Sequence, residues 1–264
     1  FDTLIRVKLK ERNLTKGTSV SKQLQQPFYK SLLFLPNITK IVIETTDDKK
    51  ISEKIVDGNY VLIEKSDVNG PSSSEEYFVF DKVSRLGDKV AKIAIAISKD
   101  SHYDYSKEKL YCYFPVRNFD TPIHALINAP FITNNSRDDV PDDSEQINKR
   151  IFTEVLEFIS EVAEKLSKPE YEDIALKMVT PFLDNKLWDS DVFDLKNKYL
   201  GFLSNAPLLP TVNLQYISIK EKPKLFFQEF PDELIGETFS TLLQLLETNE
   251  NAKLIQELAD YNGY

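Results

Sequence analysis

An apolar repeat between Ile147 and Leu166 constrains the fold of this chain more than any other feature. Its side chains recur at steps of three and four residues, the spacing that places them on one stripe of an α-helix. The stripe consists of Ile147, Ile151, Val155, Phe158, Ile159, Val162 and Leu166. The charged residues outside it are Glu154, Glu157, Glu161, Glu164 and Lys165. The sequence therefore predicts a long amphipathic helix that packs its stripe on another element and turns its charges to solvent.

Both ends of this helix are marked in the sequence. Asp142 is followed three residues later by Glu145, a pair that resembles a capping box, so we expect the helix to begin between Asp142 and Ser144. Proline lacks a backbone N–H and disfavours helix in the residue before it, so the helix should end before Pro169.

A polar loop precedes the helix and holds a single arginine, Arg137. The loop, N-N-S-R-D-D at residues 134–139, follows an apolar strand end and consists of residues whose side chains bond their own backbone and favour turns. Two interpretations of the arginine are open. Either it pairs with Asp138, Asp139 or a nearby carbonyl, or it offers its guanidinium to a phosphate, which the planar fork of donors suits well.

Between residues 40 and 110 the pattern is that of strands joined by hairpins. Five runs are rich in Ile, Val, Tyr and Phe. They are Ile41 to Glu44, Ile51 to Ile55, Tyr60 to Glu64, Tyr77 to Phe80 and Val90 to Ile97. Turn signals occur at Asp57-Gly58-Asn59 and Asn69-Gly70-Pro71. We expect an α/β (α+β) fold in which a mixed or antiparallel sheet is covered by the long helix.

After Pro169 the chain is expected to be mainly helical. The expected helices are Tyr171 to Leu183, broken at Pro181, then Trp188 to Phe202, and finally helices within Leu234 to Tyr261. A short strand pair is expected between them, from Thr211 to Lys220 and from Leu225 to Phe230.

Composition limits the classes of function. With 264 residues the chain is long enough for one large or two smaller domains, and a net charge of −9 argues against a dominant nucleic-acid surface. No apolar run approaches the roughly 20 residues of a membrane helix, and no secretory signal opens the sequence, which favours a cytoplasmic protein.

The chain offers few residues for metal or thiol chemistry. Cys112 is the only cysteine, which excludes an internal disulfide framework and a cysteine-rich zinc site, and its aromatic strand predicts a buried, inert thiol. His102 and His124 have no ligand or nucleophile at a useful spacing, so we interpret both as structural.

The arginine loop and its surroundings resemble a known family. N-x-S-R followed by an acidic spacer and a long helix looks like the catalytic loop of the middle domain in the ninety-kilodalton heat-shock chaperones, which are GHKL ATPases. Y-C-Y-F-P at Tyr111 to Pro115, then I-N-A-P-F-I and S-R-D-D, is closer still to the chaperone-like ATPase regions of sacsin and its bacterial relatives. The resemblance implies that Arg137 acts on the terminal phosphate of ATP, with Asn134 and Ser136 matching the nucleotide-contacting motif. The family's glutamine falls near Pro141 here, so that second phosphate contact is not implied.

The first residues are similar to another part of the same family. T-L-I-R-V-K-L-K from Thr3 resembles the last strand of a GHKL nucleotide-binding domain, which a Gly-Thr pair opens and whose threonine lines the adenine pocket. Asp2 replaces the glycine, and Thr3 matches the threonine. A strand at the start of a chain usually needs partners that precede it, so we expect a fragment of a longer protein. The Glu/Asn helix, the D-x-G-x-G loop and a glycine-rich lid are missing from the sequence, so this chain is not expected to bind ATP alone.

These expectations combine into one functional hypothesis with two alternatives. Residues 1–40 would end a nucleotide-binding domain, residues 41–168 would form a middle, transducer-like domain, and residues 169–264 would form a mostly helical part. ATP and Mg²⁺ would be held mainly by the preceding domain, with a protein client and a homodimer as further partners, and the family implies a role in bacterial antiviral defence. The first alternative is a non-catalytic interaction scaffold that binds protein through aromatics such as Phe226 and Phe227. The second, a DNA-handling GHKL protein of the topoisomerase kind, is disfavoured by the acidic charge.

Overall fold

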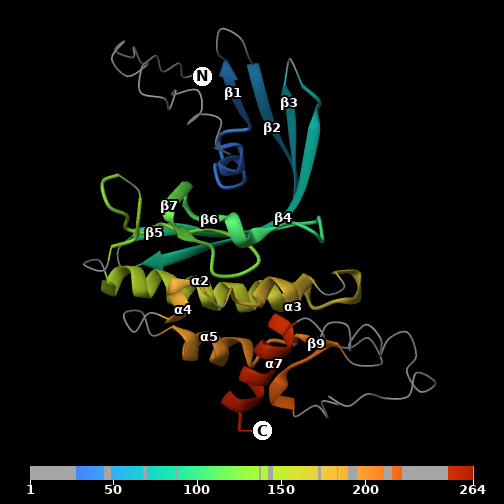
Figure 1. The fold of residues 1–264 in the computed structure, drawn as a ribbon, viewed down its shortest axis with the longest axis vertical. Coiled ribbons are helices and arrows are strands. Elements are labelled where there is room, and N and C mark those ends of the chain that lie inside the picture. Colours follow the sequence, from blue (N-terminus) through green and yellow to red (C-terminus); the bar gives the residue numbers. More distant parts are fainter. Residues whose placement is uncertain are drawn as a thin grey trace, which may run out of the picture. The chain divides into compact units, whose positions relative to one another are not determined.

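The chain has an α/β fold, as expected. The computed structural model describes residues 28–44, 49–67, 70–86, 89–136, 138–141, 145–171, 174–182, 184–189, 195–210, 216–221 and 249–263. Within them, eight strands pair in the order β1-β2-β3-β4-β5-β8-β6-β7, and a separate pair is formed by β9 and β10 (Figure 1). The chain divides into two compact units, residues 1–76 and 77–264. The domain limits expected at residues 40 and 168 stay predictions.

The first unit is an antiparallel sheet packed by a short 3-10 helix. Its elements are η2 (Phe28–Leu33), β1 (Lys40–Glu44), β2 (Lys49–Asp57), β3 (Tyr60–Asp67) and the beginning of β4 (Ser73–Leu86). The hairpin between β2 and β3 turns through Gly58 and Asn59, because Asp57 pairs with Tyr60. Gly58 has a φ of 58°, a conformation that side chains disfavour, so the turn signal in the sequence has a direct structural cause.

Lys54 joins the sheet of this unit to the 3-10 helix. Its side chain is only 8% exposed, and its Nζ donates to the carbonyl oxygens of Leu32 and Leu35, both at 2.7 Å. The last carbonyls of a helix lack partners within it, and a cation there satisfies them. The buried ammonium is thus a structural cap for the helix end.

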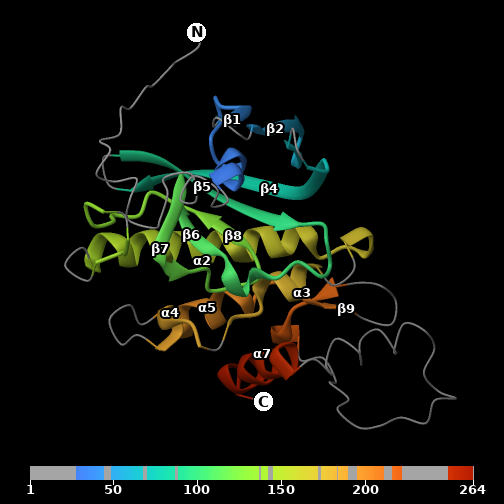
Figure 2. The ribbon, with the colours of Figure 1, turned by 45° about the horizontal axis from the view of Figure 1, so that its top comes forward.

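The second unit has three layers. Its elements are the rest of β4, then β5 (Lys89–Ser98), η3 (Tyr105–Lys107), β6 (Lys109–Cys112), β7 (Phe114–Asp120), β8 (Leu126–Asn128), α2 (Glu145–Leu166), η5 (Pro169–Tyr171), α3 (Ile174–Val179), α4 (Lys186–Asp189), α5 (Lys196–Leu203), β9 (Leu209–Pro210), β10 (Tyr216–Ile217), η6 (Ile219–Glu221) and α7 (Asn249–Tyr261). In both views α2 lies between the strands β5 to β8 on one side and α5 and α7 on the other (Figure 1, Figure 2).

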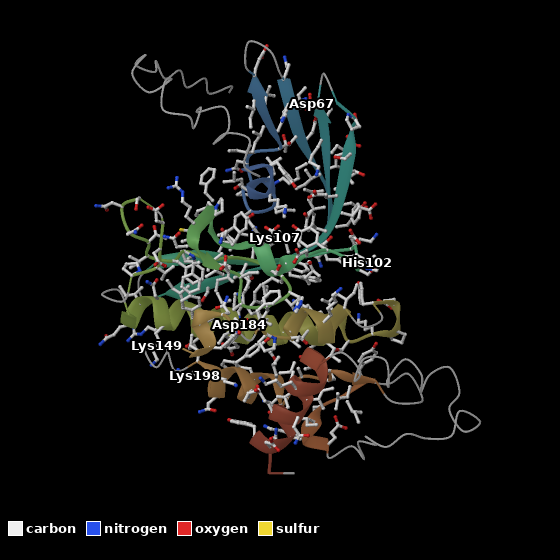
Figure 3. All side chains as sticks on the ribbon, viewed as in Figure 1. Asp67, His102, Lys107, Lys149, Asp184 and Lys198 are labelled. Atoms are coloured by element: carbon white, nitrogen blue, oxygen red, sulfur yellow. The ribbon has the colours of Figure 1, made fainter. Side chains whose placement is uncertain are left out.

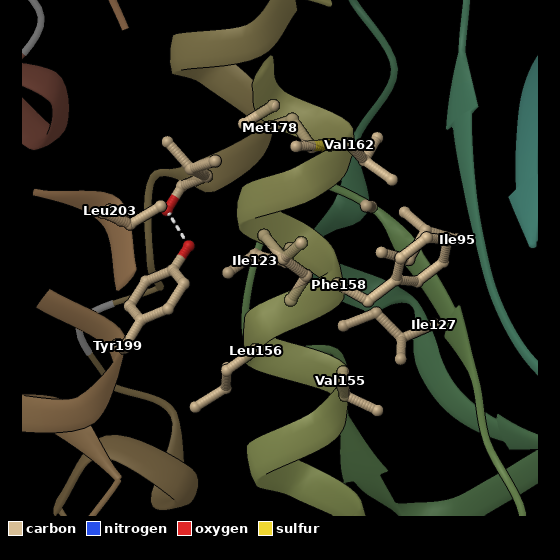
Figure 4. Packing of buried hydrophobic residues seen from close by; sticks show 14 of the residues in the cluster. Ile95, Ile123, Ile127, Val155, Leu156, Phe158, Val162, Met178, Tyr199 and Leu203 are labelled. Carbon is tan, nitrogen blue, oxygen red and sulfur yellow. Dashed lines mark hydrogen bonds between the residues drawn. The ribbon is translucent and has the colours of Figure 1, made fainter. Parts of the chain in front are cut away.

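One side of α2 packs on the sheet. Val155, Phe158 and Val162 point toward the strand residues Ile95 and Ile127 (Figure 4). All five side chains are at most 1% exposed, as the apolar stripe predicts. Complete burial of side chains of this size contributes about 1.5–3 kcal/mol each, so this face is a major source of the unit's stability.

The opposite side of α2 packs on the C-terminal helices. Leu156 points away from the sheet, toward the side of Tyr199 and Leu203 (Figure 4). Tyr199 is buried, its hydroxyl donates to the carbonyl oxygen of Val179, and burial raises the pKa of its phenol. Because α2 is covered on two sides, Phe152, Leu156 and Ala163 are buried as well, although they lie outside the predicted stripe.

The first turn of α2 departs from the prediction. Ile147 belongs to the stripe but is 51% exposed, whereas its neighbour Asn148 is 0% exposed. Asn148 Oδ1 accepts from the backbone N–H of Ile132 at 2.9 Å, and its Nδ2 donates to the carbonyl oxygen of Ile132 at 3.1 Å. Loop backbone lies against this turn, and backbone needs a polar partner, so asparagine is buried in place of isoleucine.

Two of the glutamates predicted to face solvent are tied to β4. Glu161 accepts from Lys82 Nζ at 2.5 Å, and this hydrogen bond raises the pKa of Lys82. Glu154 accepts from the Ser84 hydroxyl at 2.9 Å. The polar face of α2 therefore carries specific bonds along the edge of the core.

The C-terminal part is helical, with differences in detail. The helix expected from Tyr171 is reduced to α3, which ends before Pro181 as predicted. The helix expected over Trp188 to Phe202 overlaps α4 and α5, and residues 190–194, which lie between these two helices, are outside the described residues. Of the later predictions, β10 and α7 fall within the expected strand and helix, and residues 222–248 lie outside the described part of the chain.

The burial of α2 gives a direct test of this architecture. Val155→Asp would place an unpaired charge between the layers, so we expect a loss of more than about 4 kcal/mol in the free energy of unfolding, or loss of soluble protein. The matched control is Glu164→Gln, at an exposed position of the same helix, which should change stability by less than about 0.5 kcal/mol. Urea unfolding of the three proteins measures the difference, and a stable Val155→Asp protein would contradict the layer order.

Candidate functional site

The loop between β8 and α2 is closed on itself by Asn134. Its side-chain Oδ1 accepts from the backbone N–H groups of Asp138 at 2.8 Å and Asp139 at 3.4 Å, and from the Ser136 hydroxyl at 3.2 Å. The backbone N–H of Asn134 donates to the carbonyl oxygen of Asp139 at 3.1 Å. Residues 134 and 139 are thereby held together, and the chain between them forms a compact bend.

Arg137 lies outside the described residues, but both of its neighbours are described. Ser136 and Asp138 are each bonded to Asn134, so the two residues that flank the arginine share one anchor. Asn134 and Ser136 are exposed. The structure brings these two predicted site residues together. Thr3, the other predicted site residue, lies outside the described residues.

Strand β7 holds the downstream half of the loop. The backbone N–H of Asn118 donates to the carbonyl oxygen of Asp138 at 2.7 Å, and Arg117 Nη1 lies 3.2 Å from Asp138 Oδ1. Asp138 Oδ1 is buried and makes no hydrogen bond among the described residues. Its contact with Arg117 Nη1 is therefore an ion pair and not a hydrogen bond, despite the short distance. The Arg117 side chain is 72% exposed and that of Asp138 is 29% exposed.

The upstream half of the loop is held by α2 and β6. Asn148 binds both backbone groups of Ile132, and the Cys112 thiol donates to the carbonyl oxygen of Phe131 at 3.5 Å. The Phe131 ring packs on Phe152 of α2, with 4.7 Å between the ring centroids. Cys112 is half-buried, where full burial was expected, because β6 reaches the surface at this end.

The turn between β6 and β7 is a strained neighbour of the loop. Cys112 pairs with Phe114, so Tyr113 alone makes the turn, with a φ of 62° that is unusual for a residue other than glycine. Its N–H donates to Oδ1 of the buried Asn128 at 2.6 Å. Because β6 and β8 are parallel, the Tyr113 turn and the segment that leads into the loop leave the sheet at the same edge. Tyr113 is 41% exposed there.

Several of the contacts that hold the loop are missed by sequence reasoning. Arg117, Asn118 and Asn148 support the loop from β7 and α2, yet none belongs to a recognised motif. The N-N-S-R-D-D composition signals a turn, but which residue closes it depends on a fold in which β7 passes beside Asp138. Asn148 is the one contact for which the sequence offers a signal, because it is a polar residue on an otherwise apolar helix face.

The two histidines have different surroundings in this unit. His124 Nδ1 lies 3.0 Å from the carbonyl oxygen of Thr180, and its ring packs on Phe182, with 4.3 Å between the centroids. His102 is exposed in the turn after β5 (Figure 3), and its backbone N–H donates to Asp100. Among the described residues, no group of three or more His, Cys, Asp or Glu side chains is arranged to hold a metal ion.

A separate groove lies among α4, α5 and α7. Trp188 stacks on Tyr199 with 4.9 Å between ring centroids, and Lys196 pairs with Glu257 at 3.0 Å across the groove. None of its lining residues belongs to the arginine loop. No helix in the described part of the chain has the length and apolar character needed to span a membrane.

Comparisons with known proteins add nothing to the site described above. No protein-family model, curated protein or solved structure matches the chain. The motifs that carry the GHKL resemblance, at residues 111–115 and 134–137, therefore stand beside the loop geometry as separate observations.

The positive φ of Tyr113 predicts which substitutions at this position the protein tolerates better. Asparagine tolerates a left-handed backbone, whereas a β-branched residue does not, so Tyr113→Asn should be more stable than Tyr113→Val by about 1 kcal/mol or more. Urea unfolding of the two variants beside the wild type measures this. The reverse order, with valine better tolerated, would show that the turn at this position is not left-handed in solution.

Proposed function

We propose that this chain is the middle, transducer-like portion of a GHKL ATPase similar to sacsin and its bacterial relatives. In this proposal Arg137 contacts the terminal phosphate of ATP that a preceding nucleotide-binding domain holds. The observation that carries the proposal is the anchored, exposed loop. Its two halves are fixed to β7 and α2, and the arginine of an N-x-S-R motif stands between them in the sequence.

The chemistry of phosphoryl transfer suits an arginine held in this way. Negative charge spreads over the oxygens of the transferred group, and a guanidinium placed beforehand stabilises that charge without reorganising during the reaction. A loop with fixed ends lowers the entropic cost of bringing the arginine to its target. Bound ATP would supply the phosphoanhydride bond that is broken. The preceding domain would hold the Mg²⁺ ion and most of the adenine pocket. Thr3 of this chain is proposed to line that pocket.

Asn134 and Ser136 have distinct parts in this proposal. Asn134 uses its Oδ1 for three bonds inside the loop, which leaves its Nδ2 group as the donor for a phosphate oxygen. The Ser136 hydroxyl donates to Asn134, so its remaining lone pairs do not suit an anion. We therefore infer that Asn134 assists the arginine, and that Ser136 maintains the shape of the loop.

The position of the loop also provides a route for coupling. Asn148 ties the loop to the first turn of α2, and α2 contacts both the sheet and the C-terminal helices. A displacement of the loop toward the nucleotide would act on an element that touches every layer of the second unit. Cytoplasmic location, a protein client, a homodimer and a role in antiviral defence belong to the same proposal and rest on the family resemblance.

An interaction scaffold without turnover is the second candidate. It is favoured by two carboxylates that directly follow Arg137 and by apolar side chains exposed beside the loop, Tyr113 at 41% and Ile132 at 39%. In that case the arginine serves an ion pair, and the edge of the sheet binds protein. The two candidates differ in what the arginine does to nucleotide turnover.

Substitution of Arg137 in the full-length protein separates them. Arg137→Ala should leave ATP affinity nearly unchanged and lower turnover by about a hundredfold or more, because the arginine acts where charge develops. Arg137→Lys should rescue little, since an ammonium lacks the planar fork. Single-turnover hydrolysis beside equilibrium nucleotide binding measures both quantities. Arg150→Ala, an exposed arginine on α2, is the control, and wild-type turnover in Arg137→Ala would remove the proposed role.

The chain by itself gives a second test. Residues 1–264 contain neither the glycine-rich phosphate loops of the family nor its magnesium-binding motif, so the purified chain should hydrolyse ATP no faster than a buffer control. A coupled phosphate-release assay with and without Mg²⁺ measures this. Magnesium-dependent turnover by the purified chain would contradict the assignment of the nucleotide site to a preceding domain.

A further inference from the structure

We propose that the groove among α4, α5 and α7 binds a small anionic ligand that carries one flat apolar ring, such as an aromatic carboxylate. The groove lies within the second unit and shares no residue with the arginine loop, so the inference is independent of the proposed function. Three properties of the groove support it: its aromatic wall, the charges at its rim and its volume.

The wall of the groove is aromatic and apolar. The rings of Trp188 and Tyr199 stack with 4.9 Å between their centroids, and one leucine each from α5 and α7 adds to the lining. Trp188 Nε1 donates to the carbonyl oxygen of Pro122 at 3.1 Å. The Tyr199 hydroxyl donates to the carbonyl oxygen of Val179 (Figure 4). Because the polar atoms of both rings are already bonded inside the protein, the wall offers the groove only apolar surface, which suits a flat apolar ring.

The rim of the groove carries one uncompensated positive charge. Its charged side chains are those of Lys196, Lys253 and Glu257. Lys196 and Glu257 form an ion pair at 3.0 Å between α5 and α7, so their charges compensate each other. Lys253 is exposed, and it has no hydrogen bond or ion pair within the described part of the chain. An ammonium group has donors and no acceptor, so the polar end of the ligand must be an acceptor, and an anion suits it best.

The volume of the groove limits the ligand to about one ring. The groove encloses about 110 Å³. An apolar cavity of roughly 150 Å³ binds benzene, whereas drug-sized ligands need pockets of roughly 300–1,000 Å³. A single ring can therefore enter between the helices while its charged group stays at the rim beside Lys253. A nucleotide, with a base, a sugar and phosphates, is too large for this site.

The chain contains a natural reporter for this site. Trp188 is its only tryptophan, so tryptophan fluorescence comes from the wall of the groove. The probe is benzoate, which has one ring and one carboxylate, and benzamide is its uncharged counterpart of similar size. Benzoate titrated into the purified chain should change the fluorescence of Trp188 saturably. Benzamide should bind about fivefold more weakly or worse, because it cannot form a charge-assisted contact with Lys253.

Two lysine variants locate the contact. Lys253→Gln should weaken benzoate binding by about fivefold and leave benzamide binding unchanged, because only the charge at the rim is removed. Lys198→Gln is the matched control, since Lys198 is an exposed lysine of α5 that does not line the groove, and it should bind benzoate like the wild type. Both side chains are exposed, so both variants should fold, and thermal melting checks this.

The outcomes separate the inference from its alternatives. Saturable benzoate binding that Lys253→Gln weakens and Lys198→Gln retains supports it. A fluorescence change that rises linearly with benzoate, or no change, overturns it, because the probe then occupies no site. Equal affinities for benzoate and benzamide, or for the wild type and Lys253→Gln, also overturn it, because the lysine then does not select an anion. None of these results depends on Arg137, so the proposed function is tested separately.

Discussion

The burial of α2 on two sides is the constraint on which the second unit depends. Val162 and Phe158 face the sheet, and Leu156 faces the C-terminal helices, all of them at most 1% exposed. Each such side chain contributes about 1.5–3 kcal/mol when it leaves water, so one helix supplies much of the core of both neighbouring layers. The sheet and the helices α3, α5 and α7 share one continuous hydrophobic cluster through it. The packing of α2 therefore links the sheet to the C-terminal helices.

The loop before α2 is held at both ends by this arrangement. Its upstream end is bound by Asn148 on the first turn of the helix, and its downstream end is bound by Asn118 on β7. Both anchors belong to packed elements, so the described residues of the loop are held at both ends by the fold. The exposed Asn134 closes the bend with its own side chain. The loop therefore needs little further contact to keep its shape.

The sequence predicts the parts of this fold that depend on periodicity. The stripe predicts α2 and its buried members, and each of the five expected strands falls within an observed strand. It fails where a contact joins distant residues. Ile147 continues the stripe, yet Asn148 is buried, because backbone and not sheet lies against that turn. The pair of Arg117 with Asp138, and the single-residue turn at Tyr113, follow from how β6, β7 and β8 align. Local pattern does not encode that alignment.

The loop geometry bears on which interpretation of Arg137 is stronger. If the arginine served only a local ion pair, Asp138 and Asp139 would be its natural partners. Asp138 already faces Arg117, and Asp139 Oδ1 already accepts from the N–H of Val140 at 2.9 Å. A carboxylate that has one partner gains less from a second, since its charge is partly compensated before the second arrives. Asp138 and Asp139 thus each have a contact with a described residue, which is consistent with the proposal that the arginine serves a ligand from outside the loop.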